Sequence, residues 1–194
     1  MPKALVEYRG SLLVERAAQT LTTAGCASTV VVIGAGAEHV RAAAPDLEFV
    51  ENSDWATGMA SSLRAGLAAL HDREAGAAVV LLVDMPGVTP ASVRRVSAGA
   101  TPATLAMGGY GEGRGHPVLL GREHWTGVAD AATGDVGARD YLRAHEDLLR
   151  VVALDDVADD FDLDTPEQAT MRDVFDGLLG GGTAAGGSAC GVVG

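Results

Sequence analysis

The chain has 194 residues, with 14 lysines and arginines against 26 aspartates and glutamates, and its formal net charge is −12. This length suits one domain with a core of its own. The charge argues against nucleic-acid and anionic-membrane binding, because there is no basic patch to release counterions. It still allows a nucleotide ligand held by one or two local cations and a divalent metal.

The two cysteines, Cys26 and Cys190, provide neither a disulfide framework nor a zinc-binding spacing. No apolar run approaches the roughly 20 residues that a membrane span requires, and the N-terminus carries no signal-peptide pattern. We therefore expect a soluble, cytoplasmic, acidic protein.

Helix and strand signals alternate along the chain. Helices are predicted over 11–24, with Ser11 as a candidate N-cap, and over 37–44, 59–70, 90–98, 137–145 and 166–179. Strands are predicted over 29–33, 47–50, 79–83, 104–107, 117–120 and 150–154. This alternation is typical of an α/β fold with a doubly wound, mostly parallel sheet, and residues 1–179 are expected to form it as a single domain.

Both ends of the chain depart from this pattern. A helix pattern follows Met1-Pro2-Lys3 at once, so the strand that normally opens such a sheet is expected to be missing. Residues 180–194 are mostly glycine, alanine and serine. They cannot bury enough apolar surface to offset their ordering entropy, so we predict a disordered tail there.

The segment Val79-Val80-Leu81-Leu82-Val83-Asp84-Met85-Pro86 is an apolar run that ends in an acid. Such runs are typical of strands buried on both faces, and ligands of open α/β sheets bind at the carboxyl ends of these strands. Asp84 is therefore a candidate Mg²⁺ ligand, since that ion prefers carboxylate oxygen. The structural alternative is a loop or helix-capping aspartate.

Segment 52–63 places amides and hydroxyls just before and within the first turn of a helix. Free N–H groups at a helix N-terminus suit a phosphate or a polar ring, whereas the structural alternative is a plain helix capped by Thr57. Further along, Arg114-Gly115-His116-Pro117 follows several glycines. We expect residues 108–115 to be a mobile loop near a ligand, with His116 donating to an anionic group or serving only a structural role.

Segment 162–167 starts the last predicted helix. Thr165 or Asp164 as the cap and Pro166 at the first helical position are a sufficient structural explanation. Alternatively, a second acid at this edge could complete a metal site with Asp84.

Taken in order, these segments resemble the molybdenum cofactor cytidylyltransferase branch of the MobA-like nucleotidyltransferases. The family pattern opens with a strand and a glycine-rich loop ending in Arg-Met-Gly, then Pro-Lys, and Met1-Pro2-Lys3 looks like the end of that signature. The similarity runs from residue 2 to about residue 175, and its other segments are 52–63, 82–86, 115–117, 134–139 and 162–167.

The resemblance implies a Rossmann variant like that of the nucleotide-diphospho-sugar transferases. The implied reaction is attack of a pterin phosphate on the α-phosphorus of CTP, with release of pyrophosphate. Lys3 would neutralise triphosphate charge, Asp84 would hold Mg²⁺ with Asp164 as a second ligand, and His116 would face the pterin. The nucleotide or acceptor pocket would be lined by Asn52, Gly58, Ser62 and Arg114. Transfers of this kind need in-line positioning and neutralisation of developing charge.

The chain departs from the family at its start, where the strand and the triphosphate loop have no counterpart. We expect weakened nucleotide binding and a central position of the sheet that is empty or filled abnormally, and we favour a true start upstream of Met1. The implied partners are CTP, a molybdopterin-type acceptor and a molybdoenzyme of the xanthine dehydrogenase type.

Two other functions stay open. One is a non-catalytic accessory protein that binds the molybdenum cofactor, which the missing loop favours. The other is an NAD(P)-linked oxidoreductase of the nicotine-blue type, since such proteins also resemble this family. Against it, Val32-Ile33-Gly34-Ala35-Gly36-Ala37 lacks the last glycine of a dinucleotide fingerprint.

Overall fold

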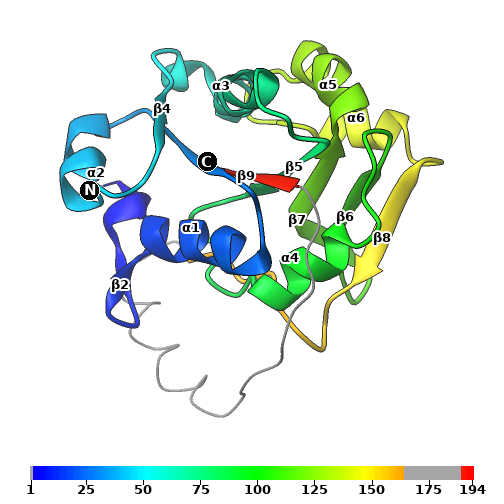
Figure 1. The fold of residues 1–194 in the computed structure, drawn as a ribbon, viewed down its shortest axis with the longest axis horizontal. Coiled ribbons are helices and arrows are strands. Elements are labelled where there is room, and N and C mark those ends of the chain that lie inside the picture. The colour runs from blue at the N-terminus through cyan, green and yellow to red at the C-terminus, as the bar shows by residue number, and fades with distance from the viewer. Residues whose placement is uncertain (1, 164–188) are drawn as a thin grey trace.

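A computed structural model, which describes residues 2–163 and 189–194, places a seven-stranded sheet between two layers of helices (Figure 1). The strand order is β4-β3-β9-β5-β7-β6-β8. The strands are β3 (Thr29–Ile33), β4 (Phe49–Glu51), β5 (Ala77–Leu81), β6 (Leu105–Tyr110), β7 (Gly113–Gly121), β8 (Leu149–Ala153) and β9 (Ala189–Val193), and a separate hairpin pairs β1 (Glu7–Tyr8) with β2 (Ser11–Leu12).

The prediction of a doubly wound, mostly parallel sheet is confirmed. Strands β4, β3, β9 and β5 run parallel to one another, and β6 is parallel to β8. Only β7 is antiparallel to its neighbours β5 and β6. The carboxyl ends of β3, β9 and β5 therefore meet at one edge, where α/β sheets bind their ligands.

Helices cover both faces of this sheet. They are α1 (Leu13–Ala24), α2 (Ala37–Ala43), α3 (Met59–His71), α4 (Pro90–Ser97), α5 (Trp125–Ala131) and α6 (Arg139–Ala144), with short 3-10 helices η1 (Lys3–Leu5), η2 (Trp55–Thr57) and η3 (Arg122–His124). In the described part of the chain, no helix is long and apolar enough to cross a membrane.

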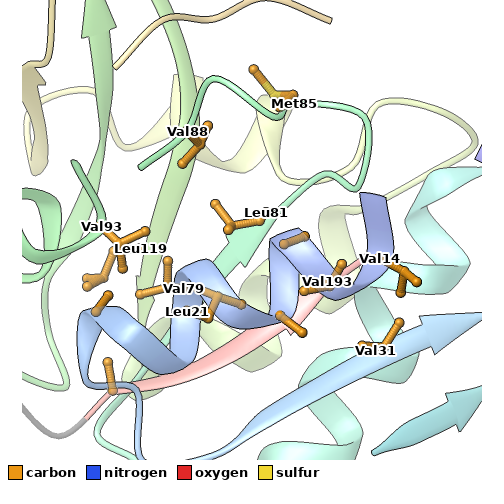
Figure 2. Packing of buried hydrophobic residues seen from close by; sticks show 14 of the residues in the cluster. Val14, Leu21, Val31, Val79, Leu81, Met85, Val88, Val93, Leu119 and Val193 are labelled. Atoms are coloured by element: carbon orange, nitrogen blue, oxygen red, sulfur yellow. The ribbon is translucent and has the colours of Figure 1, made fainter. Parts of the chain in front are cut away.

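Each face of the sheet carries its own apolar cluster. On one face, α1, α2 and α4 pack on the sheet, and Leu21, Val79, Val93 and Val193 meet there (Figure 2). On the other, α3, α5 and α6 cover a second cluster that includes Val192. Successive residues of β9 thus enter opposite clusters, as the alternation of side chains along a strand requires.

The prediction of a disordered tail from residue 180 is wrong for residues 189–193. Residues 189–193 form β9, every one of them is buried, and the strand lies between β3 and β5 in the middle of the sheet. This is the central position expected to be empty or filled abnormally, and a strand from the other end of the chain occupies it. The composition argument failed here because Cys190, Val192 and Val193 suffice for a strand whose two neighbours are already present. Residues 180–188 and the helix predicted over 166–179 lie outside the described residues.

The glycine-rich stretch predicted as a mobile loop is instead most of a β-hairpin. Strands β6 and β7 pair through Gly108, Gly109, Gly113 and Gly115, with Gly111 in the turn at a positive φ of 56°. A Cβ on Gly109 would lie 2.8 Å from Val151 of β8, so glycine here permits close strand packing rather than loop motion.

At the N-terminus, Ser11 belongs to β2 and is not an N-cap. Helix α1 begins after Leu12, whose backbone N–H donates to the Glu15 carboxylate at 3.0 Å. A glutamate at the third position of the helix thus accepts a hydrogen bond from a backbone N–H that has no partner within the helix, as in a capping box.

Candidate active site

Asp84 lies at the carboxyl end of the central strands, as its position after β5 predicted. Its carboxylate accepts a hydrogen bond from the Lys3 ammonium, with 2.8 Å between Nζ and Oδ2, and its side chain is 19% exposed against 45% for Lys3. The Val83 N–H donates to the Gly194 carbonyl at 3.0 Å, and the Leu163 N–H donates to the Asp84 carbonyl at 2.7 Å. The end of β9 and the segment after β8 therefore hold the Asp84 backbone in place.

The described residues could hold a divalent cation only together with substrate phosphates and water. The described residues contain no group of three or more His, Cys, Asp or Glu side chains that could hold a metal ion by themselves. Mg²⁺ commonly uses one or two carboxylates and takes its remaining ligands from substrate phosphates and water. Asp84 can supply one such carboxylate, and Asp160 and Asp162 line the cavity next to it.

The cavity has a volume of about 780 Å³ and opens beside this edge. Its lining residues come from β5 to β9 and, on the helical side, from α3, α6 and the loop between α5 and α6. A volume of this size accommodates a drug-sized ligand. Ser62, Arg114 and His116, three of the predicted substrate-binding residues, line it.

His116 is held neutral in this cavity. Desolvation lowers the pKa of its imidazole to about 4, and the nearby Asp84 carboxylate opposes this shift without cancelling it. A neutral imidazole can accept a hydrogen bond or donate one, but it brings no positive charge to an anion at neutral pH. Arg114 supplies charge instead, although its guanidinium is already 2.7 Å from the Glu146 carboxylate.

Asn52 is buried and does not line the cavity. Its amide nitrogen donates to the hydroxyls of Ser61 (2.7 Å) and Ser62 (3.1 Å), and its side-chain oxygen accepts from the Asp54 N–H at 3.0 Å. The amide therefore orients Ser62, which does face the cavity. A direct contact between Asn52 and a substrate stays a prediction.

The N-terminus of α3, a predicted phosphate site, is already occupied by another segment of the chain. The Ala60 N–H donates to the Gly134 carbonyl at 2.8 Å, and the Met59 N–H donates to the Asp135 carboxylate at 3.1 Å. Gly58 permits this approach, because a Cβ there would lie 2.5 Å from the Gly134 backbone, and its φ is 112°. In this arrangement Gly58 allows the segment with Gly134 and Asp135 to pack against the start of α3.

Asp164, the second predicted metal ligand, lies outside the described residues. Arg139 and Arg143 of α6 line the cavity and were not among the predicted site residues. Arg139 belongs to segment 134–139, which the sequence singled out only as a pattern, so its position there was the one available signal.

Comparison with known proteins assigns the chain to a family. Residues 1–148 match the MobA-like NTP transferase domain. The chain belongs to this family. It is also 38% identical over 176 residues to the nicotine blue oxidoreductase of Paenarthrobacter nicotinovorans, a match that covers 86% of this chain and 85% of that protein.

Several solved structures share the fold. Rv0371c from Mycobacterium tuberculosis H37Rv, solved in complex with manganese, is 28% identical, with a TM-score of 0.71 over 88% of this chain and 90% of that one. The 2-C-methyl-D-erythritol 4-phosphate cytidylyltransferase from Thermus thermophilus is 18% identical, with a TM-score of 0.61 over 89% of this chain and 93% of that one. The likeness to the cytidylyltransferase shows a shared fold and no more.

Proposed function

We propose that this protein is a cytoplasmic nucleotidyltransferase that uses Mg²⁺ to transfer CMP from CTP to the phosphate of a molybdopterin-type acceptor, with release of pyrophosphate. The observation that carries this proposal is the Lys3–Asp84 pair at the carboxyl edge of the central strands, beside a cavity of about 780 Å³. Membership of the MobA-like NTP transferase family supports the reaction class.

Asp84 would hold the metal, with Asp164 as a second ligand. When bound, the cation supplies neutralisation of phosphate charge, which is a large part of catalysis in phosphoryl-type transfer. That the relative Rv0371c was solved in complex with manganese supports the use of a divalent ion by this protein. Lys3 lies 2.8 Å from Asp84, so its ammonium is close enough to bind the same triphosphate and offset its charge.

The cavity would hold the acceptor. Neutral His116 orients a hydroxyl or phosphate oxygen without adding charge, and the Ser62 hydroxyl, fixed by Asn52, offers a further hydrogen bond. Positioning of this kind converts a bimolecular encounter into an oriented reaction.

A second candidate is an NAD(P)-linked oxidoreductase, which the relative from Paenarthrobacter nicotinovorans favours. The glycine turn between β3 and α2 argues against a pyrophosphate there. A Cβ on Gly34 would collide with Trp55, and one on Gly36 would lie 2.8 Å from Pro2. Side chains of the chain itself therefore occupy the space that a dinucleotide would need at these glycines.

Pyrophosphate release with each nucleoside triphosphate, Mg²⁺ and a molybdopterin preparation tests the proposal, with oxidation of NADH and NADPH measured in parallel. We expect release with CTP above the other nucleotides and a loss of about two orders of magnitude in Asp84→Asn, the scale for removal of one preorganised charged group. Asp147→Asn, an exposed acid outside the cavity, is the matched control and should keep full activity.

Unchanged turnover in Asp84→Asn would remove Asp84 from the metal site. Nicotinamide oxidation without pyrophosphate release would favour the oxidoreductase. Binding of the molybdenum cofactor with neither reaction would favour an accessory protein that passes the cofactor to a molybdoenzyme.

A further inference from the structure

Positive charge gathers on one wall of the cavity. Arg139 and Arg143 of α6 and Arg114 of β7 all line it, in a chain with only 14 lysines and arginines and a net charge of −12. Of the acids that line the cavity, Asp160 and Asp162 belong to the segment that follows β8 and leads to the contact with Asp84, whereas Glu146, just after α6, is paired with Arg114 at 2.7 Å. The cavity therefore has an acidic side at the strand edge and a cationic side at α6.

The two arginines of α6 are weakly engaged within the protein. Arg139 makes no side-chain hydrogen bond or ion pair in the described part of the chain. Among the described residues, Arg143 forms an ion pair only with Asp140, at 3.4 Å, and the side chains of Arg143 and Asp140 are 72% and 54% exposed. A pair of this kind contributes little to stability, so both guanidinium groups can turn to a ligand at small cost.

Apolar side chains line the cavity as well. Met59 and Met107 line the cavity together with Leu142 and Leu149. Methionine sulfur is polarisable, adapts to irregular shapes and makes favourable contacts with aromatic rings. This apolar part of the lining therefore suits a flat, ring-bearing body.

We propose that Arg139 and Arg143 form an anion subsite, which binds a carboxylate, sulfonate or phosphate on a ring-bearing ligand, away from the end that reacts near Asp84. The identification of this ligand as the nucleotidyl acceptor rests on the proposed function, whereas the subsite itself does not. Planar guanidinium groups suit such anions because they can donate two hydrogen bonds at once.

Two fluorescent probes test the subsite in the full-length protein without nucleotide or metal. Anilinonaphthalene sulfonate carries a ring system and one anion, and phenylnaphthylamine is its uncharged counterpart. We expect the double variant Arg139→Gln, Arg143→Gln to bind the sulfonate about fivefold more weakly and the uncharged probe with unchanged affinity. The two probes should compete in the wild-type protein, because both would contact the apolar lining of the cavity.

The double variant Arg41→Gln, Arg94→Gln is the matched control, since it removes the same charge at exposed or partly exposed arginines of α2 and α4. It should bind both probes as the wild type does. An equal loss in this control would assign the effect to net charge, an equal loss of both probes would assign it to cavity shape, and failure of the probes to compete would place them apart. Each result would overturn the subsite. None depends on turnover, so the nucleotidyltransferase proposal can fail or succeed separately.

Discussion

The His116 side chain couples the stability of the protein to pH. In the folded chain its pKa is lowered to about 4 from an ordinary value of 6.5, mainly because the imidazole is desolvated. Between these two values the unfolded chain takes up a proton that the folded chain refuses. The free energy of unfolding is therefore highest above pH 6.5 and decreases as the pH falls toward 4.

The variant His116→Gln should remove this dependence. We expect the free energy of unfolding of the wild type to fall by on the order of 3 kcal/mol across this window from His116 alone, and the variant to lose that part of the slope. Chemical denaturation at several pH values between 6.5 and 4 measures it. The exposed His39 of α2 provides the control, and His39→Gln should keep the wild-type slope. Parallel slopes for wild type and His116→Gln would contradict a desolvated, neutral imidazole.

At the level of elements, the start of α3 depends on a segment more than 70 residues away. The Asp135 carboxylate accepts from the Met59 N–H, and the contact spans 76 positions in sequence. An acid here satisfies a free N–H group and meets the positive end of the helix. The same loop lines the cavity through Val136 and Gly137, so the cap also fixes one cavity wall.

Asp135→Ala should destabilise the protein by about 1 kcal/mol, the usual cost of a lost N-cap. Because Asn52 and Ser61 hold the same helix turn, we expect the loss to be local, with faster amide exchange at Met59 and Ala60. Thermal unfolding and hydrogen exchange measure the two effects. Asp147→Ala removes one exposed charge elsewhere and should leave both unchanged; equal destabilisation by the two variants would deny the cap.

The elements that the sequence predicted well are those with a strong local pattern. Strand 29–33 is β3 at both ends, and the helices predicted over 59–70 and 90–98 agree with α3 and α4 to within one residue. Helix α5 (Trp125–Ala131) was not predicted, because threonine and glycine near its start weaken the helical signal. Strands β6 and β7 include glycines that allow neighbouring strands to pack closely, and local composition does not predict this role.

The site residues likewise include some that local sequence predicts and some that it does not. Asp84 could be found because it follows a strand whose carboxyl end is recognisable in sequence, and His116 because it follows a run of glycines. The cap of α3 by Gly134 and Asp135 and the placement of Arg143 in the cavity could not, since each depends on contacts between distant segments. The fold makes these contacts, and no local pattern encodes them.

For the molecule as a whole, β9 joins the two halves of the sheet. It pairs with β3 on one side and with β5 on the other, and its Val192 and Val193 side chains enter opposite apolar clusters. The Gly194 carbonyl then accepts from the Val83 N–H, one residue before Asp84. The seating of this strand therefore affects both the stability of the core and the position of the candidate metal ligand.

Gly191 is the sharpest test of that seating. A Cβ at this position would lie 2.5 Å from Cδ1 of Leu21 and 3.0 Å from its Cβ and Cγ, so helix α1 packs directly on the β9 backbone. Gly191→Ala should destabilise the protein by about 1–3 kcal/mol through overpacking and should speed amide exchange at Val83. Gly76→Ala is the control, because a Cβ there meets only Pro102 at 3.9 Å, and it should be neutral or slightly stabilising by reducing the entropy of the unfolded chain. If urea denaturation gave the two variants the same free energy of unfolding, β9 could not lie against α1 in the centre of the sheet.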